Sequence, residues 1–358
     1  MIYVVTFSKE VTQGGGKAVL DYLWSINCAG KGDKLTLLSL TGETNLSDIA
    51  KSHGFEVICL NLYFSPNFFK NLLQFLKLCI RDGVVFISND ERSTFFCSIG
   101  YILGCIHVVV LHRVLTDIPL WKNPLKNALF IKIENLVLRK FTTRVVAISE
   151  HMKNNIIKRN VNEKKIDIVY HKFNKDFKFI KQFAVIDFDR IKLLYVGRLQ
   201  EEKGIQNLVK MFGTLPLQRN MSLTVIGDGS LRGELNNESN HNVSYLGHLK
   251  ITDEIYQSYD VVVIPSKTEA FCFVALEAIQ NGRFVIYRDI PALKEILVQY
   301  PYSVSFRNDE ELKQLFFKLS KSINIFNREF DSGVTLNSLS RYSNKQQSIN
   351  WNKVLNQC

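Results

Sequence analysis

Two glutamates, Glu269 and Glu277, stand eight residues apart in the segment PSKTEAFCFVALE, Pro265–Glu277. The segment follows the apolar run Val261–Ile264, so we expect Glu269 in a strand-to-helix turn and Glu277 about one turn into the helix. A carboxylate can accept two hydrogen bonds from vicinal hydroxyls, as in a ribose. The pair therefore predicts two polyol-binding positions, with a solvated helix position as the plain alternative for Glu277.

The same helix is expected to begin at about Phe273. The first amides of a helix have no acceptor within the helix and attract phosphate. We therefore expect Phe273 and Val274 to contact a bound anion. Two polyol-binding carboxylates beside an anion site describe a nucleotide sugar.

Two cations lie in a second segment, LYVGRLQEEKG, Leu194–Gly204. A strand is expected to end at Val196, followed by Arg198 in a turn and by Lys203 at the start of the next helix. Two cations at the carboxyl end of a strand can stabilise a diphosphate leaving group without a metal. An ordinary surface pair is the alternative, because this spacing is common.

Three glycines follow the first strand in TQGGGK, Thr12–Lys17, where backbone can come close to a ligand. The segment is not a triphosphate-binding P-loop, because Val11 replaces the first glycine and Ala18 replaces the magnesium-binding Ser or Thr. It is not G-x-G-x-x-G either. By itself the segment indicates only a tight turn.

His112 and Arg113 end another buried run and are expected to point into a cleft, although a lone histidine is more often structural. Asp187–Asp189 spells D-x-D but lies in a segment without clear periodicity, so we do not assign it a metal. Nowhere else do His, Cys, Asp or Glu show metal-ligand spacing.

The chain has 358 residues, of which 46% are hydrophobic and 22% charged, so it is expected to form two globular domains rather than a disordered or fibrous protein. Its net charge is +11. Residues 1–175 hold 23 basic and 14 acidic residues, and residues 176–358 hold 22 and 20. The first half therefore carries most of the excess positive charge, which favours an anionic partner that binds to that half. Lysines that only keep the protein soluble are the alternative.

The seven cysteines form no C-x-x-C pair and are expected to be reduced thiols of a cytosolic protein. The apolar stretch Phe95–Leu111 is short for a bilayer crossing, and we expect a helix at about 92–104 and a strand at about 107–112. The residues Met1–Ser8 lack a basic region, so no signal peptide is expected.

Short apolar runs alternate with segments of helical period, which is typical of parallel sheets covered by helices on both faces. The first series of expected strands is Ile2–Phe7, Leu35–Leu40, Glu56–Leu60, Val84–Ser88, His107–Leu111 and Val145–Ser149. The helices expected between them are Ala18–Cys28, Pro66–Ile80, Arg92–Leu103 and Pro124–Phe141.

The pattern restarts after residues 171–189 with the strands Lys192–Val196, Leu223–Ile226, Val243–Leu246, Val261–Ile264 and Phe284–Tyr287. We therefore expect an α/β chain with domains at 1–172 and 191–340 and a linker at 173–190. A final helix at 341–358, with Trp351 on its apolar side, is expected to cross back to the first domain. Ligands of such sheets bind at the carboxyl ends of strands, which places a ligand between the two domains.

These segments resemble the family-4 (group 1) retaining glycosyltransferases. The likeness is strongest over residues 191–297, where GRLQEEKG, VIGDGSLRGEL, VSYLGHL, YDVVVIPSKTEAFCFVALEA and DIPALKEIL stand in the family's order. It is weaker before residue 175, where Gly15, Gly16, His112 and VVAISE carry it. The resemblance implies the GT-B fold, in which two Rossmann-like doubly wound domains face each other across a cleft.

The resemblance also implies roles for the residues above. Glu269 would contact the donor sugar, Glu277 the ribose, and Arg198 and Lys203 the diphosphate of a UDP- or GDP-linked donor. By the same resemblance, Gly15 and Gly16 approach the donor and His112 lies near the reacting centre. The family is metal-independent and needs no cofactor beyond its donor. Cys272, where the family often has Gly, leaves the donor's identity open.

Lysines and arginines lie among apolar residues in Trp121–Arg144 and Pro66–Arg81. This composition favours binding to an anionic membrane surface. Related bacterial enzymes of surface polysaccharides often use lipid-linked saccharide acceptors at the cytoplasmic face of the inner membrane. The resemblance therefore implies peripheral membrane association and a role in O-antigen, lipopolysaccharide or capsule synthesis. Helices that simply pack one face on the sheet are the alternative.

Two other classes of function remain open. One is a non-catalytic GT-B subunit of a transferase complex, which the filled set of charged positions argues against. The other is a nucleic-acid-binding protein, which the chain disfavours because it has no helix-turn-helix, RRM or zinc-finger signature and carries its charge on one half.

Overall fold

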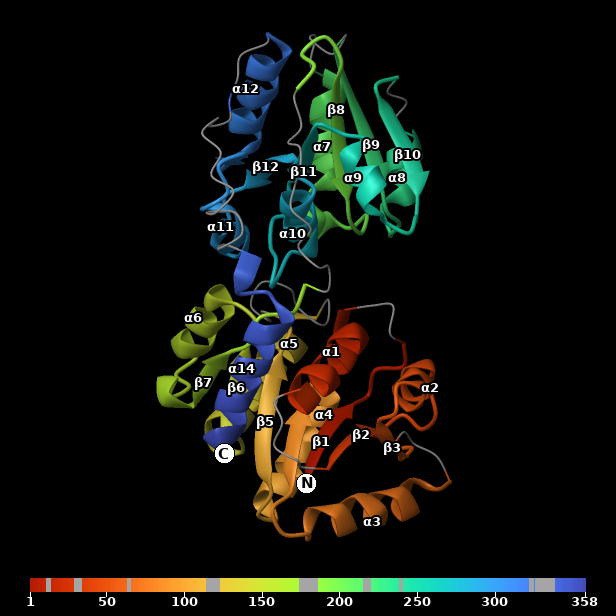
Figure 1. The fold of residues 1–358 in the computed structure, drawn as a ribbon, viewed down its shortest axis with the longest axis vertical. Helices are drawn as coiled ribbons and strands as arrows, with labels where there is room; N and C mark the ends of the chain where they lie inside the picture. Colours follow the sequence, from red (N-terminus) through yellow and green to blue (C-terminus); the bar gives the residue numbers. More distant parts are fainter. Residues whose placement is uncertain are drawn as a thin grey trace. The chain divides into compact units, whose positions relative to one another are not determined.

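The structure is a computed structural model of the chain, and it describes residues 1–10, 14–28, 34–62, 66–113, 123–173, 186–214, 220–237, 241–321, 325 and 339–358. Two compact units make up the fold (Figure 1). The first contains Met1–Lys172 together with Arg341–Cys358, and the second contains Phe173–Ser340.

The first unit is built on a parallel sheet of seven strands in the order β3-β2-β1-β4-β5-β6-β7. The strands are β1 Ile2–Thr6, β2 Leu35–Ser39, β3 Glu56–Cys59, β4 Val85–Ser88, β5 Ile106–Leu111, β6 Arg144–Ala147 and β7 Ile166–Ile168. Its helices are α1 Gly14–Cys28, α2 Asn45–Ser52, α3 Phe68–Cys79, α4 Glu91–Ile102, α5 Pro124–Lys140, α6 Glu150–Lys158, the short turn η1 Glu163–Lys165 and α14 Asn344–Asn356.

The second unit is built on a parallel sheet of six strands in the order β10-β9-β8-β11-β12-β13. The strands are β8 Ile191–Val196, β9 Met221–Ile226, β10 Val243–Gly247, β11 Val261–Ile264, β12 Phe284–Arg288 and β13 Ser303–Phe306. The helices are η2 Glu201–Lys203, α7 Ile205–Thr214, α8 Arg232–Asn237, α9 Asp253–Gln257, α10 Phe273–Gln280, α11 Pro291–Leu297 and α12 Asp309–Ser320.

Both sheets reverse their strand order at the first strand of the unit. In the second unit β8 lies between β9 and β11, and Val261 of β11 pairs with Leu193 of β8 and Phe284 of β12. This is the doubly wound order, in which the loops after the two central strands diverge and leave room for a ligand. The loops after β8 and β11 are those that carry the predicted charged residues.

Apolar runs form the central strands because both of their faces are covered. All five residues of β1 and all four of β11 are buried. In the first unit Tyr3 and Val5 of β1 pack with Phe75 of α3 and Cys97 of α4 in one buried cluster. The two parallel α/β sheets confirm the predicted fold class.

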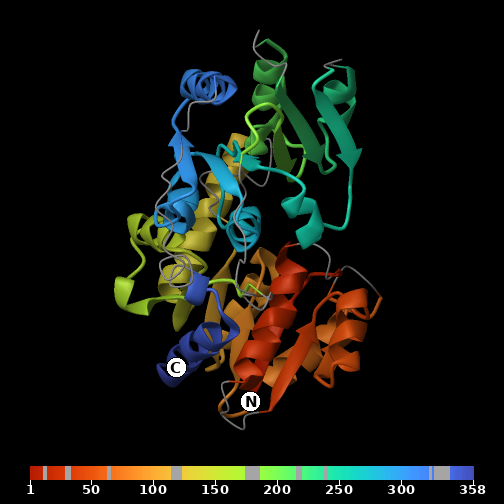
Figure 2. The same cartoon turned by 45° about the horizontal axis from the view of Figure 1, so that its top comes forward.

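The last helix, α14, belongs to the first unit and lies beside α1 (Figures 1 and 2). Trp351 is fully buried there, and its ring meets the edge of Tyr22 at 5.2 Å between centroids. The side chain of Gln347 accepts a hydrogen bond from the Ser25 hydroxyl and donates one to the Tyr170 carbonyl at 2.9 Å. Residues Arg341–Cys358 therefore pack as part of the first unit.

Several predicted boundaries were wrong. Helix α1 begins at Gly14, so Gly15 and Gly16 lie in its first turn rather than in a loop. The helix begins there although glycine costs about 1 kcal/mol per residue in a helix. Lys203 ends the turn η2, and α7 begins only at Ile205.

The stretch Phe95–Leu111 divides into α4 and β5, as predicted. Among the described residues, no helix has both the length and the hydropathy to cross a bilayer. Thr12 and Gln13, Trp121 and Lys122, and linker residues 174–185 lie outside the described residues. The seven cysteines are free thiols, four of them buried.

Candidate active site

The predicted anion- and sugar-binding residues of the second unit gather at one end of the sheet. Arg198 and Lys203 follow β8, and Glu269 and Glu277 follow β11, the strand that pairs with β8. Because carboxyl ends of parallel neighbours meet at one edge, two segments about 70 residues apart share one site. The structure pairs Lys203 directly with Glu269 and places Arg198 and Glu277 on the segments that follow the same two neighbouring strands, where the strand order reverses.

Glu269 is the most enclosed member of the group. Its side chain is 8% exposed, and the carboxylate oxygen Oε1 lies 2.5 Å from Nζ of Lys203. The Ser266 hydroxyl donates to the same oxygen at 2.9 Å. A buried carboxylate needs such partners to remain charged, so the lysine and the serine fix its position in the turn.

Close backbone contact holds the two loops together. Gly204 has φ +70°, and a Cβ there would lie 2.2 Å from the carbonyl oxygen of Pro265. Glycine is the residue that tolerates both the left-handed conformation and this approach. Gly204 therefore allows the turn carrying Lys203 to rest on the turn carrying Glu269.

Arg198 is the outward-facing cation of the pair. Its side chain is 63% exposed, and Nη2 lies 3.6 Å from Oε1 of Glu202. Tyr195 donates its hydroxyl hydrogen to the Arg198 carbonyl at 2.9 Å, which fixes the backbone of the turn. The backbone of Arg198 is thus fixed while its guanidinium is accessible. This arrangement is suited to binding a phosphate group.

Glu277 is anchored by a residue that sequence analysis missed. The hydroxyl of Tyr256, on α9, donates to Oε2 of Glu277 at 2.6 Å. Burial and the charge of Glu277 raise the pKa of Tyr256, so the phenol stays protonated and acts as the donor. Glu277 is half-buried, which rules out the solvated alternative. No sequence signal links two residues 21 positions apart on different helices.

The helix that carries Glu277 begins where it was expected to begin. Phe273 and Val274 are the first two residues of α10, and no side chain caps the helix at Cys272. Their amides therefore belong to the end of the helix that favours anions. Burial, with the nearby charge of Glu269, raises the pKa of the Cys272 thiol to about 12, so the thiol is neutral at pH 7.

His112 lies in the first unit, after β5, within a group of aromatic rings. Its ring stacks on those of Tyr22 and His171, with centroids 5.8 and 5.3 Å away. Its Nε2 lies 2.6 Å from Oδ1 of Asn89, the residue after β4. Burial lowers the pKa of His112 to about 4. The neutral ring therefore donates from Nε2 to the amide oxygen and keeps Nδ1 as an acceptor.

In the described parts of the chain, no three His, Cys, Asp or Glu side chains are grouped as metal ligands would be. Asp187 and Asp189 are both described, and the Asp189 amide donates to the Asp187 side chain at 3.0 Å within an exposed turn. The charged group of the second unit consists of paired cations and carboxylates, the composition expected of a diphosphate and hydroxyl site.

Comparison with known proteins finds glycosyltransferases among the proteins that this chain resembles. The sequence profile of the family described as "Glycosyl transferases group 1" matches residues 176–324. An uncharacterized glycosyltransferase of Methanocaldococcus jannaschii is 30% identical over 43% of this chain and 44% of its own length. The capsular polysaccharide biosynthesis glycosyltransferase CapM of Staphylococcus aureus is 29% identical over 38% of this chain and 40% of its own length. The matches thus span about half or less of these relatives.

Similarity of structure extends further than similarity of sequence. HepE of Anabaena, solved in complex with UDP, superposes with a TM-score of 0.74 over 100% of both chains at 14% identity. That likeness shows the fold, GT-B, for the whole chain. The sequence match to the group 1 glycosyltransferases covers residues 176–324, within the second unit.

Proposed function

We propose that the protein is a retaining glycosyltransferase that moves a sugar from a nucleoside-diphosphate sugar to a saccharide acceptor. The observation that supports this most is the gathering of Arg198, Lys203, Glu269 and Glu277 where β8 and β11 end. UDP- and GDP-linked sugars are the proposed donors, and HepE, a neighbour of the same fold, has been solved with UDP.

In this proposal each charged residue has one task. Glu277 accepts the ribose hydroxyls through a carboxylate that Tyr256 already orients. Glu269 accepts hydroxyls of the donor sugar, and the first amides of α10 with Arg198 and Lys203 bind the diphosphate. An ammonium has three N–H donors, so Lys203 can keep its bond to Glu269 while it donates to a phosphate oxygen.

The reaction then needs electrostatic stabilisation more than a protein base. The bond between the sugar C1 and the diphosphate oxygen breaks, and the acceptor oxygen attaches to C1 from the same face. The acceptor proton passes to the departing phosphate. Arg198 and Lys203 stabilise the charge that develops on the diphosphate. His112 and the start of α1, at Gly15 and Gly16, are proposed to approach the donor from the first unit.

A nucleotide screen tests the proposal. We expect one of UDP, GDP, ADP, CMP or dTDP to stabilise the second unit, by about 2.7 kcal/mol at 100 times its dissociation constant. Glu277→Ala should abolish that shift, and the matching nucleotide sugar should be consumed when an acceptor is added. No stabilisation by any nucleotide would contradict the donor site.

A non-catalytic GT-B subunit of a transferase complex is the second candidate, and the same screen separates it from the enzyme. Such a subunit would bind the nucleotide sugar but would not release the nucleoside diphosphate from it, whichever acceptor is supplied. Release of the nucleoside diphosphate by the wild type, and its loss in Lys203→Met, would decide for the enzyme.

For the acceptor we propose a lipid-linked saccharide of bacterial surface-polysaccharide synthesis, used at the cytoplasmic face of the membrane. CapM supports the polysaccharide class. Helix α5 supports the membrane, because Leu125, Leu129 and Ile133 are 79, 60 and 46% exposed at a helical spacing. The exposed Lys126 and Lys132 lie on the same helix, which suits an anionic surface.

Not every basic residue of this region contributes. Arg139 donates to the Arg159 carbonyl, and Arg144 pairs with Asp167 at 2.5 Å inside the unit. The proposed membrane surface is therefore α5 with its lysines. Helix α3, where Phe69 and Leu73 are exposed, is a second, separate candidate.

Vesicle binding tests this surface. Lys126→Gln with Lys132→Gln should weaken binding to vesicles of anionic phospholipid, and Leu129→Ser should weaken it further at high salt. Lys313→Gln with Lys318→Gln on α12 removes the same charge from the other unit and is the control. Equal binding by both double variants would contradict the proposal.

A further inference from the structure

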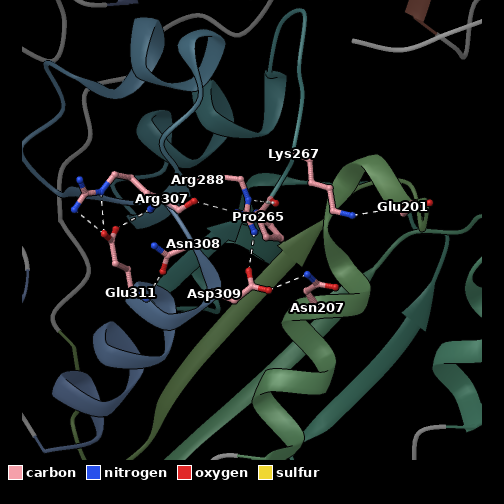
Figure 3. Close-up of polar contacts among 9 residues, drawn as sticks. All are labelled: Glu201, Asn207, Pro265, Lys267, Arg288, Arg307, Asn308, Asp309 and Glu311. Atoms are coloured by element: carbon pink, nitrogen blue, oxygen red, sulfur yellow. Dashed lines mark hydrogen bonds and ion pairs between the residues drawn. The ribbon is translucent and has the colours of Figure 1, made fainter.

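Arg288, the last residue of β12, is enclosed among three elements of the second unit. Its side chain is 15% exposed. Its Nε donates to the carbonyl oxygen of Pro265 at 3.1 Å, and its Nη2 lies 2.9 Å from Oδ1 of Asp309 (Figure 3). Its Nη1 donates to the Arg307 carbonyl at 3.3 Å, and its guanidinium lies 4.9 Å from the ring centre of Phe306.

The two partners of Arg288 belong to different parts of the unit. Pro265 begins the turn that carries Glu269. Asp309 begins α12, and its Oδ2 accepts a hydrogen bond of 2.8 Å from Asn207 of α7. Arg288 therefore connects the glutamate turn to α12, and through Asp309 to the helix that follows Lys203 (Figure 3).

The Pro265 carbonyl is contacted from two directions. Gly204 approaches it so closely that a Cβ would lie 2.2 Å away, and Arg288 donates to it. One carbonyl oxygen thus joins the loop after β8 to the end of β12. A substitution of Arg288 would remove the hydrogen bond that holds the Pro265 carbonyl, against which the turn carrying Lys203 packs.

A second pair of contacts closes the other side of the same turn. The Lys267 amide donates to the Glu202 carbonyl at 2.8 Å, and Lys267 Nζ lies 3.3 Å from Oε1 of Glu201 (Figure 3). The exposed side chains of Lys267 and Glu201 make this a weak pair. The enclosed contact of Arg288 is the stronger of the two constraints, because it is charge-assisted and shielded from water.

We propose that Arg288 is a positioning residue for the donor site. By holding the Pro265 carbonyl against Gly204, it sets the separation between the cations after β8 and the carboxylates after β11. It touches no donor atom in this role. The inference rests on the proposed function, because the separation matters only if one donor spans both loops.

The experiment measures UDP and GDP binding by calorimetry and donor turnover by nucleotide release. Arg288→Lys keeps the positive charge but lacks the planar guanidinium whose N–H groups donate to three acceptors at once. We expect it to raise the dissociation constant of the nucleotide that binds wild type by roughly tenfold, to raise KM for the donor and to lower kcat. Arg307→Met is the matched control, because that exposed side chain pairs only with Glu311 in the described network and its loss leaves the Arg307 carbonyl in place.

Asp309→Asn is a second variant in case Arg288→Lys folds poorly. It keeps the shape of the acceptor but removes its negative charge, which weakens the bond to the Arg288 guanidinium. We therefore expect a smaller increase in the nucleotide's dissociation constant than in Arg288→Lys. Unchanged nucleotide affinity in both variants, or a lowered Tm with unchanged affinity, would overturn the positioning role. If the wild type binds no nucleotide at all, the proposed function itself fails. Weaker binding in both variants with wild-type affinity in Arg307→Met supports the inference.

Discussion

Lys203 Nζ and Glu269 Oε1 lie 2.5 Å apart, although the two residues are 66 positions apart in the chain. Their side chains are 18 and 8% exposed, so each charge depends on the other for its solvation. The cation proposed for the diphosphate and the carboxylate proposed for the donor sugar are therefore one electrostatic unit before any ligand arrives.

That coupling predicts a non-additive response to mutation. Lys203→Met should destabilise the second unit by about 3 kcal/mol, because it leaves a buried carboxylate without its cation. The double variant Lys203→Met/Glu269→Gln should recover much of this loss while remaining inactive. Urea unfolding of the wild type, Lys203→Met, Glu269→Gln and the double variant gives the coupling free energy. Additive effects, within about 0.5 kcal/mol, would contradict the pairing.

Gly204→Ala should damage both stability and donor binding. The added Cβ would lie 2.2 Å from the Pro265 carbonyl at φ +70°. The left-handed conformation alone costs about 1–2 kcal/mol for a non-glycine residue, and separating the two loops adds to it. Gly233→Ala is the control, since nothing lies within 4 Å of its Cβ. Thermal unfolding with and without UDP distinguishes the two variants.

Tyr256→Phe should weaken nucleotide binding and also lower the stability of the second unit. It removes the 2.6 Å hydrogen bond to Glu277, and hydrogen bonds to charged groups contribute about 1.5–3 kcal/mol. The carboxylate would then lose its fixed orientation towards the ribose. Calorimetry with the free nucleoside and with the nucleotide should show the same loss, because the contact lies at the ribose. A loss confined to the nucleotide would argue against this assignment.

His112 should make the first unit sensitive to mild acid. Its pKa is about 4 in the folded chain and about 6.5 when unfolded. Between these pH values the unfolded chain binds more protons, so stability is complete above pH 6.5 and declines as the pH falls towards 4. NMR titration of the imidazole should show it neutral at pH 5.5. A charged ring at that pH would contradict the stacked, neutral arrangement.

Helix α14 should stabilise the first unit despite its distance in sequence. Trp351→Ala should cost about 3–5 kcal/mol, the usual range for a buried aromatic residue, because Trp351 is fully buried against Tyr22. Ile349 on the same helix is 51% exposed, so Ile349→Ala should be nearly neutral. Denaturant unfolding followed by a probe in residues 1–172 makes the comparison.

Much of this architecture follows from the sequence because its signals are local. Buried parallel strands are continuous apolar runs, so the central strands, such as Val261–Ile264, could be located within a residue or two. The edge strands β7 and β13 were missed, because β7 has only three residues and β13 alternates serine with apolar residues instead of forming an apolar run. The charged residues were found because their spacing within each loop is fixed by one turn and one helix.

Tertiary structure decided what those residues contact. The bond of Tyr256 to Glu277, the junction of Arg288, Pro265 and Gly204, and the ring stack around His112 each join segments that are distant in sequence. The start of α1 at Gly14 likewise runs against the low helix propensity of glycine. Sequence periodicity reports which side of an element is buried, and only the folded sheet order determines which elements become neighbours.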